Sequence, residues 1–257
     1  MLELWNIDVI FNKGTVDEAQ LFDGFCLNIQ KGDFVSVVGS NGSGKTTMLN
    51  LICGTLNPDA GEILLEGKNI IKLAEHRRAK KIGRVFQDPK AGTCSGLTVL
   101  ENFALADNKN KPFGLTAAVN KKRIDTYRQL LSTCNMGLED RMNVPVGALS
   151  GGQRQAIALV LACMTKVDLL ILDEHTAALD PKSSETIMQL TDRLIRENQM
   201  TALMVTHNLR HAVEYGNRIL MMDKGKILLD LDGEQKQKTV VEDLLSVFNE
   251  ISIECGN

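Results

Sequence analysis

A glycine-rich segment limits the possible folds of this chain more than any other feature. The residues GSNGSGKT stand at positions 39–46, directly after the apolar run FVSVVG (34–39) and before the helix-like stretch TTMLNLICGTL (46–56). The spacing G-x-x-x-x-G-K-[ST] lets a loop bend around a phosphate with its N–H groups pointing inward, and the following helix adds its positive N-terminal end. A continuous apolar strand before such a loop predicts an α/β fold around a buried parallel sheet.

The side chains of this loop have distinct expected roles in binding a nucleotide. Lys45 can reach the β- and γ-phosphates, the hydroxyl of Thr46 can bind Mg²⁺, and Thr47 can bond an α-phosphate oxygen. The residues expected to contact the nucleotide here are Gly39, Ser40, Asn41, Gly42, Ser43, Gly44, Lys45, Thr46 and Thr47. The alternative, a glycine loop with an incidental lysine, does not explain why a strand precedes the loop and a helix follows it.

A second apolar run, VDLLILDE (167–174), ends in two adjacent carboxylates. A phosphate-binding loop needs an acidic partner for Mg²⁺, and Asp173 at the end of a buried strand fits that role. We expect Glu174, which would point the other way along the strand, to polarise the attacking water beside the γ-phosphate. The alternative is a solvated acidic strand end, which the presence of the loop disfavours.

The residues LSGGQ (149–153) predict a second anion-binding helix terminus. Ser150, Gly151 and Gly152 stand where a helix would begin, so they offer a hydroxyl and backbone N–H groups with no side chains in the way. One chain has little use for two such termini on one γ-phosphate. In two chains arranged head to tail, each nucleotide would lie between the loop of one subunit and LSGGQ of the other. We therefore expect a homodimer in the ATP-bound state.

These segments together resemble the ATP-binding-cassette (ABC) ATPases. FVSVVGSNGSGKTT (34–47) resembles the Walker A segment of that family, LSGGQ matches its signature, and LLILDE (169–174) resembles its Walker B segment. The resemblance covers nearly the whole chain, and the motifs follow the order of the family. It implies that ATP and Mg²⁺ are the cofactors.

The resemblance also assigns roles to residues outside the three main segments. Gln87, in GRVFQDP, resembles the Q-loop glutamine, which contacts Mg²⁺ and senses the membrane partner. Gln153 completes the signature, and Asp180, in AALD, resembles the D-loop aspartate that reaches across the dimer. His207, in LMVTHN, resembles the switch histidine at the γ-phosphate. The expected catalytic residues are thus Glu174, His207 and Gln87, and the expected metal-binding residues are Thr46, Gln87 and Asp173.

The alternation of apolar runs and helical patterns indicates a β/α core with a helical insert. The resemblance implies a P-loop NTPase core of the RecA-like type, an N-terminal antiparallel β-subdomain and an inserted α-helical subdomain. Within one ABC ATPase domain (1–257), residues 1–87 and 159–257 would form the catalytic core with the β-subdomain, and residues 88–158 the helical subdomain that carries LSGGQ.

Two further positions bear on the resemblance. Phe11 falls where the family stacks an aromatic ring on adenine, but an ordinary aromatic residue of a strand core is the alternative. Val160 stands where many members carry an arginine, so packing or ion pairing must differ there.

The histidines need separate interpretations. His175 stands where most members carry proline; it is either a tolerated replacement, or its imidazole bonds across the dimer or to Glu174 and tunes catalysis. His76 and His211 lie in polar sequence contexts, and we expect both at the surface.

Composition excludes several classes of protein. The net charge of −3 and a pI near 5.9 give no basic field for nucleic acid. No apolar stretch reaches the roughly 20 residues that a membrane span needs, since the longest is AIALVLACM (156–164). The N-terminus lacks the features of a signal peptide, so any membrane role would come through a partner. The six cysteines form no C-x-x-C pair, and we expect reduced, buried thiols.

The function implied by the resemblance is that of an ATP-hydrolysing subunit of an ABC transporter. The segment LDEHTAALDP (172–181) resembles a narrower bacterial group that serves importers of tryptophan, tyrosine or related small solutes. Expected partners are integral-membrane permease subunits and, indirectly, a solute-binding lipoprotein, with the chain bound peripherally at the cytoplasmic face of the membrane. The alternatives are an exporter or lipoprotein-release ATPase and, less favoured, a soluble ABC protein of translation or DNA repair.

Overall fold

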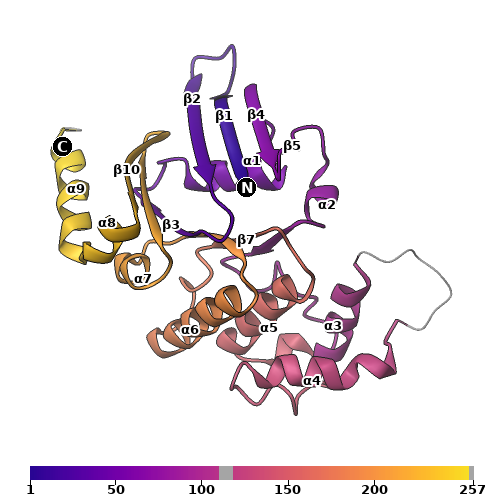
Figure 1. The fold of residues 1–257 in the computed structure, drawn as a ribbon. Coiled ribbons are helices and arrows are strands. Elements are labelled where there is room, and N and C mark those ends of the chain that lie inside the picture. Colours follow the sequence, from indigo (N-terminus) through magenta and orange to yellow (C-terminus); the bar gives the residue numbers. More distant parts are fainter. Residues whose placement is uncertain (110–117, 255–257) are drawn as a thin grey trace. The chain divides into compact units, whose positions relative to one another are not determined.

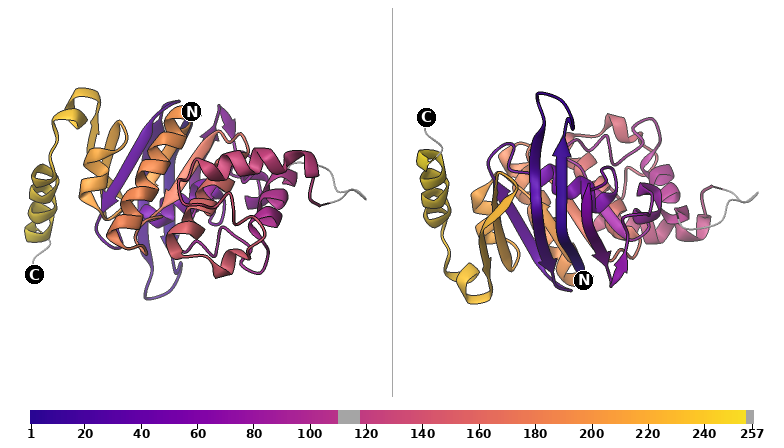
Figure 2. Two further views of the ribbon diagram at one scale, coloured as in Figure 1. Left: turned by 90° about the horizontal axis from the view of Figure 1, so that it is seen from below. Right: turned by 90° about the horizontal axis from the view of Figure 1, so that it is seen from above.

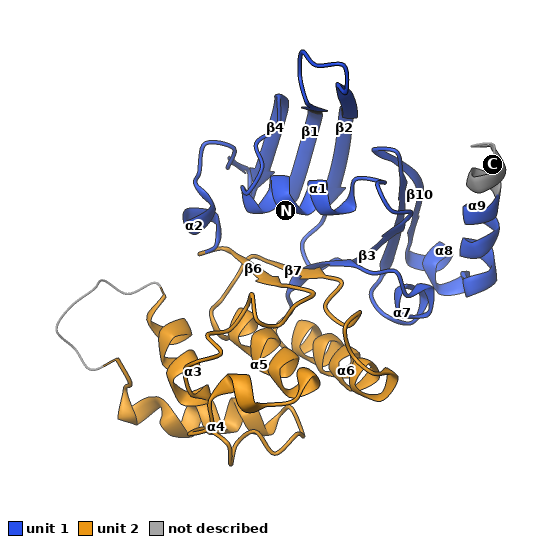
Figure 3. Cartoon of the chain, turned by 180° about the vertical axis from the view of Figure 1, so that it is seen from behind, with its two compact units in different colours: residues 1–79, 199–257 blue, residues 80–198 orange. Residues whose placement is uncertain are grey.

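The computed structural model describes residues 1–109 and 118–254, and the chain divides into two compact units (Figure 3). Unit 1 combines Met1–Ala79 with Gln199–Asn257, and unit 2 comprises Lys80–Asn198.

Unit 1 contains an antiparallel sheet near the N-terminus (Figure 1). Its strands, in the order β2-β1-β4-β5, are β2 (Ala19–Ile29), β1 (Leu2–Phe11), β4 (Ala60–Leu65) and β5 (Lys68–Asn69). The first two run side by side over most of their length, as Figure 2 shows in its right-hand view. β4 and β5 form a short hairpin, in which Leu65 pairs with Lys68 across two residues of positive φ, Glu66 and Gly67.

The remaining strands of unit 1 surround the strand that leads into the glycine-rich loop. β3 (Phe34–Gly39) is buried at every position and runs parallel to both β8 (Thr201–Val205) and β9 (Arg218–Asp223). β10 (Lys226–Asp232) pairs antiparallel with β9. The expected buried parallel strand is thus confirmed. The helices of unit 1 are α1 (Lys45–Cys53), α2 (Glu75–Arg78), α7 (Leu209–Glu214), α8 (Gly233–Lys238) and α9 (Val241–Glu254).

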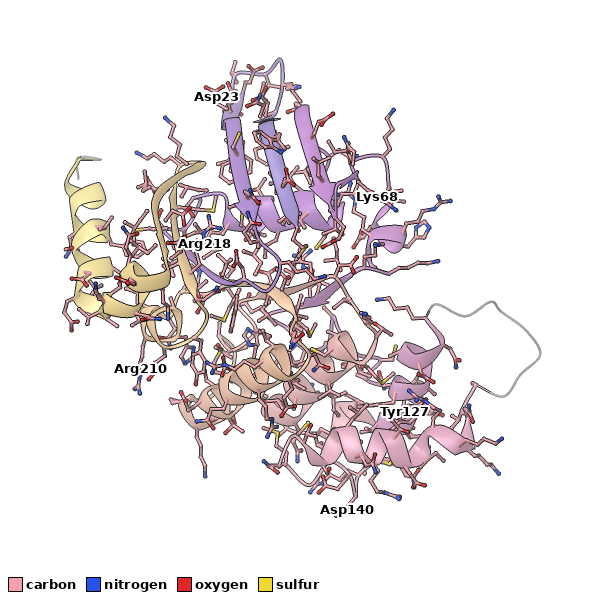
Figure 4. All side chains as sticks on the ribbon, viewed as in Figure 1. Asp23, Lys68, Tyr127, Asp140, Arg210 and Arg218 are labelled. Carbon is pink, nitrogen blue, oxygen red and sulfur yellow. The ribbon has the colours of Figure 1, made fainter. Side chains whose placement is uncertain are left out.

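Arg218 joins the two sheets of unit 1 (Figure 4). At the start of β9, its guanidinium bonds both carboxylate oxygens of Asp230 on β10, at 2.7 and 2.6 Å, and donates to the carbonyl of Asn28 on β2. The bond to Asp230 raises the pKa of Arg218, although burial acts against it.

Unit 2 combines two parallel strands with several helices. β6 (Ile82–Val85) and β7 (Leu169–Asp173) pair in register from Ile82 with Leu169 to Val85 with Leu172. The α-helices are α3 (Val99–Asn108), α4 (Ile124–Ser132), α5 (Gly151–Met164) and α6 (Pro181–Glu197). Short 3₁₀ turns lie at Lys121–Arg123 and Val146–Ala148.

The helical segment of unit 2 packs directly on its strands, so the unit is larger than the expected helical subdomain 88–158. A Cβ on Gly83 of β6 would lie 3.0 Å from the carbonyl oxygen of Ala162 on α5, which means that strand and helix are in close contact. The compact unit therefore includes β6, β7 and α6. The expected subdomain boundaries at residues 88 and 158 stay a prediction.

The expectation of buried cysteines holds only in part. Cys53 and Cys134 are buried, whereas Cys26 and Cys94 are exposed, so the expectation is wrong for these two. Burial raises the pKa of Cys134 to about 11 and that of Cys163 to about 12, which keeps both thiols protonated at neutral pH.

A buried arginine anchors the end of α1 that is remote from the glycine-rich loop. Arg78 donates to the carbonyls of Leu51 and Ile52, at 2.7 and 3.1 Å, and so satisfies oxygens that the last turn of a helix leaves without intrahelical partners. Burial lowers the pKa of this guanidinium. Gly54 is required beside it, since a Cβ there would lie 2.6 Å from Nε of Arg78.

Within residues 1–109 and 118–254, no helix has both the length and the apolar character needed to cross a membrane.

Candidate nucleotide-binding site

The glycine-rich loop of unit 1 connects the end of β3 to the start of α1, as the sequence predicts. Gly42 and Gly44 have φ values of 80° and 103°, a backbone conformation that favours glycine. Among the described residues, no side chain caps the first turn of α1, whose N-cap is Gly44. The N–H groups of this turn are therefore suited to an external anion such as a phosphate.

The loop is fixed to the rest of unit 1 by β9 and the turn after it. A Cβ on Gly39 would collide with the carbonyl oxygen of Met222, so only glycine fits where β3 meets the end of β9. The hydroxyl of Ser40 donates to Asp223 Oδ1 at 2.7 Å, and the N–H of Gly225 donates to the carbonyl of Ser43 at 3.0 Å. Asp223 and Gly225 were not singled out from the sequence, because their approach to the loop depends on strand pairing.

Lys45 lies beneath the loop and is 5% exposed. Its ammonium group donates to the carbonyls of Gly39 and Ser40 at 2.8 Å each, and to the hydroxyl of Ser43 at 3.3 Å. These acceptors carry no net charge. A phosphate would offer a charge-assisted and therefore stronger bond.

His207 lies at the same sheet edge as the loop. β8 runs parallel to β3, with Val205 opposite Val37, and the N–H of Thr206 donates to the carbonyl of Val37 at 3.1 Å. His207 follows directly and is exposed. The site residue is thus near the carboxyl end of a parallel strand, and its contact with a γ-phosphate stays a prediction.

Phe11 is the last residue of β1, opposite Ala19 on β2, and is 39% exposed. The ring is therefore not part of the strand core, and part of its surface remains for a ligand. Stacking on adenine stays a prediction.

In unit 2, the predicted carboxylates and the Q-loop glutamine also share one sheet edge. Asp173 is the last residue of β7, and Gln87 follows the end of the parallel strand β6 by two residues. Glu174 lies beyond the strand with a φ of 47°. Glu174 therefore lies outside the strand, where side-chain alternation does not apply, and the expected direction of its side chain stays a prediction.

Asp173 has a basic partner on the neighbouring strand. Arg84 Nη2 lies 2.7 Å from Asp173 Oδ2, and the two side chains are only 15% and 16% exposed. The guanidinium carbon of Arg84 also lies 4.8 Å from the centre of the Phe86 ring. Nothing in the local sequence indicates this pair, since it depends on the register of β6 against β7.

The signature residues form the start of α5, and the expected helix terminus is confirmed. Ser150 is the N-cap: its hydroxyl accepts from the N–H of Gln153, while the Gln153 side chain accepts from the N–H of Ser150, both at 3.3 Å. Gly152 has a packing role that the sequence did not reveal. A Cβ there would lie 3.1 Å from the hydroxyl of Ser183 near the start of α6.

Asp180 is the N-cap of α6 and accepts from the N–H of Ser183 at 3.0 Å. Hydrogen bonds from the side chain and then the backbone of Ser183 lower the pKa of Asp180. Asp180 therefore has a local role in starting α6, and its reach across a dimer stays a prediction. Gly151, the first residue of α5, has more room than Gly152: a Cβ there would lie 3.6 Å from the Leu179 side chain, an ordinary van der Waals distance.

His175 is a core residue of unit 2. It is 2% exposed, and its Nε2 lies 3.1 Å from the hydroxyl oxygen of Thr191 on α6. When the Thr191 hydroxyl donates its one proton to the carbonyl of Ile187, 2.7 Å away, Nε2 of His175 is the donor to Thr191 Oγ1. The imidazole thus connects the end of β7 to α6.

The other unusual positions have clear locations. His76 is exposed as expected, whereas His211 is 5% exposed, so the expectation for His211 is wrong. His211 lies on α7, with its ring 6.0 Å from that of Tyr215. Val160 is buried on α5, where an apolar side chain takes part in the core.

Comparison with known proteins agrees with these motifs. The family model described as ABC transporter matches residues 22–177. The tyrosine transport ATP-binding protein of Clostridioides difficile (strain R20291) is 41% identical over 248 residues, covering 96% of this chain and 98% of that protein. EcfA2, an energy-coupling factor transporter ATP-binding protein of Acetivibrio thermocellus, is 30% identical, and the match covers 88% of this chain and 78% of that protein.

Solved structures give the same result. The ATP-binding cassette MJ0796, in a dimeric post-hydrolysis state bound to ADP and Pi, is 31% identical with a TM-score of 0.76, covering 90% of this chain and 98% of that chain. The ADP conformation of the cassette MJ1267 is 25% identical with a TM-score of 0.80, and the match covers 100% of this chain and 99% of that chain. The fold and the motifs define an ATP-binding cassette of the P-loop NTPase type. The chain belongs to the ABC transporter family, as an ATPase subunit.

The bond from His175 to Thr191 generates a prediction about stability. Thr191→Val should lower the free energy of unfolding by about 1–2 kcal/mol, because the buried Nε2–H of His175 loses this acceptor. Urea denaturation measures the difference. Thr186→Val is the matched control, since half-buried Thr186 bonds the carbonyl of Lys182 on the same helix in the same way but without a histidine partner in that bond. Equal losses in the two variants would contradict the role of His175.

Proposed function

We propose that this chain energises a bacterial importer of an aromatic amino acid or a related small solute. The observation that carries the proposal is the 41% identity, over 96% of the chain, to a protein named for tyrosine transport. Other relatives are named for import of xylose and arabinose or of methionine, at 32% and 30% identity. Since such different solutes share one cassette design, the higher identity to the tyrosine protein favours an aromatic solute.

In the proposed reaction, ATP binds the glycine-rich loop with its phosphates at the start of α1. Lys45 exchanges its carbonyl partners for the β- and γ-phosphates. The remaining loop residues, from Gly39 to Thr47, surround the phosphates with N–H and hydroxyl groups. Phe11 would stack on the adenine.

The oxygen donors of Thr46 and Asp173 suit Mg²⁺, which prefers hard oxygen ligands and phosphates. When bound, Mg²⁺ would neutralise the charge that develops on the phosphates. Gln87 would complete this set. Glu174 would act as general base toward the attacking water, and His207 would donate to the γ-phosphate.

We further propose that ATP closes a head-to-tail homodimer. The support for this is the N-terminus of α5, where the side chains of Ser150 and Gln153, both uncharged, accept from each other's backbone N–H groups. A phosphate of the nucleotide bound to the second subunit could replace these acceptors. The related cassette MJ0796 forms a dimer with ADP and Pi bound. Gly151 and Gly152 would line the contact, and Asp180 would reach toward the other subunit.

The proposed partners follow from the transporter family. Integral-membrane permease subunits would hold the dimer at the cytoplasmic face of the membrane, and a solute-binding lipoprotein would deliver the solute on the other side. Nucleic acid has no part in this proposal.

The transport assignment is tested on the native complex. We expect the chain to co-purify from membranes with permease subunits, and we expect tyrosine or tryptophan, with the binding protein, to raise ATP hydrolysis in proteoliposomes severalfold over that with lysine. Recovery with ribosomes, or stimulation by an unrelated solute alone, would contradict the proposal.

Glu174→Gln should reduce the rate of ATP hydrolysis roughly 10²- to 10³-fold while ATP still binds, because the variant lacks a general base. It should also accumulate the ATP-bound dimer, which size-exclusion chromatography detects. Glu197→Gln, an exposed change at the end of α6, is the control. Hydrolysis by Glu174→Gln at a near-native rate would show that another group is the base.

Lys45→Ala and Ser150→Arg should differ in which step they block. Lys45→Ala should abolish ATP binding to the single chain, whereas Ser150→Arg should leave that binding intact and abolish dimerisation and hydrolysis. Thr98→Arg is the matched control, because Thr98 forms an equivalent capping box at α3 outside the signature. Equal loss of ATP binding in the Lys45 and Ser150 variants would rule out the head-to-tail arrangement.

A further inference from the structure

The pair between Arg84 and Asp173 links a residue without an assigned role to an expected metal-binding carboxylate. Arg84 lies on β6 opposite Ile171 in the parallel register, so its side chain extends along the strand direction to reach the last residue of β7. The contact of 2.7 Å joins Nη2 to one oxygen, Oδ2, of the carboxylate. A carboxylate has two oxygens and several lone pairs, so Asp173 can keep this bond while it also binds a cation.

The position of Arg84 is restricted on a second side. Its guanidinium carbon lies 4.8 Å from the centre of the Phe86 ring, a distance at which a cation is attracted to the face of an aromatic ring. Both members of the ion pair are mostly buried, which reduces screening by solvent. A planar guanidinium held in this way is a rigid donor that can fix the direction of one carboxylate.

A second ion pair joins the same two strands at their other ends. Lys81, just before β6, lies 2.7 Å from Asp168, just before β7, but these side chains are 53% and 30% exposed. The two pairs have the same charges and nearly the same distance. They differ in burial and in their position relative to the carboxyl end of the strands, where the expected site residues lie.

We propose that Arg84 is a positioning residue of the ATPase: it holds the carboxylate of Asp173 in the orientation that binds Mg²⁺ with the nucleotide. The proposal rests on the proposed function, in which Asp173 is a metal-binding residue. Removing a group that hydrogen-bonds a metal ligand and fixes its orientation typically lowers metal affinity 10- to 100-fold. Arg84 would therefore act on the metal-dependent part of nucleotide binding and leave the metal-independent part unchanged.

The test compares binding of the non-hydrolysable analogue AMP-PNP by calorimetry in excess Mg²⁺ and in EDTA. The measured quantity is the dissociation constant in EDTA divided by the dissociation constant in Mg²⁺. This ratio reports the contribution of the metal to binding without any hydrolysis. We expect Arg84→Met to reduce this ratio about tenfold with the EDTA value unchanged. Arg84→Lys, which keeps the charge, should recover part of the loss. Lys81→Met, the matched control, should leave the ratio at the native value.

Urea denaturation of each variant separates positioning from stability. A loss of stability shared by Arg84→Met and Lys81→Met, with a reduced ratio only in the former, supports the proposal. An unchanged or increased ratio in Arg84→Met would overturn it, and so would an equal reduction in Lys81→Met. If Arg84→Met does not fold, Arg84→Gln provides the same comparison.

Asp173→Asn distinguishes failure of this proposal from failure of the proposed function. If Asp173→Asn loses the metal-dependent contribution and Arg84→Met keeps it, Asp173 binds the metal and Arg84 does not position it. If Asp173→Asn keeps the contribution, the metal assignment of Asp173 is wrong, and the role of Arg84 is overturned with it.

Discussion

Burial of the parallel strands determines where charged side chains can lie in this chain. β3, β7 and β8 are buried at all positions apart from Asp173, which ends β7 and is half-buried. Charged groups are therefore absent from these strands before Asp173 and concentrate where the strands stop, because a buried charge without partners is costly. The glycine-rich loop, His207 and Asp173 all follow this rule, each at the carboxyl end of a parallel strand.

The helix N-termini differ in whether a side chain caps them, and this determines which of them keeps backbone donors for a ligand. α3, α5 and α6 begin with the side-chain caps Thr98, Ser150 and Asp180, whereas α1 begins at Gly44 with no side-chain cap among the described residues. A capped helix start has satisfied part of its donors, but α1 keeps its donors for an anion. At α5 the cap consists of two neutral groups, which a charged phosphate oxygen can replace.

The ionic groups of the candidate site already have partners within the chain. Lys45 bonds carbonyls of its own loop, Ser40 bonds Asp223, and Asp173 bonds Arg84. These contacts keep the side chains ordered and satisfied, since a buried polar group without a partner costs free energy. In the proposed function, nucleotide binding would exchange the carbonyl partners of Lys45, while Asp173 would keep its bond to Arg84. Such a prepared arrangement would limit the reorganisation that the reaction requires.

The glycine-rich loop, the buried strand before it, the acidic strand end and the helix start at Ser150 could be predicted from the sequence, because each depends on residues that are neighbours in the chain. Three contacts could not be predicted in this way: Arg84 with Asp173, Ser40 with Asp223, and His175 with Thr191. These contacts join residues separated by 89, 183 and 16 positions, so they depend on strand register and on the packing of α6. The turn at Glu174 was also missed, because strand alternation does not reveal where a residue adopts a positive φ.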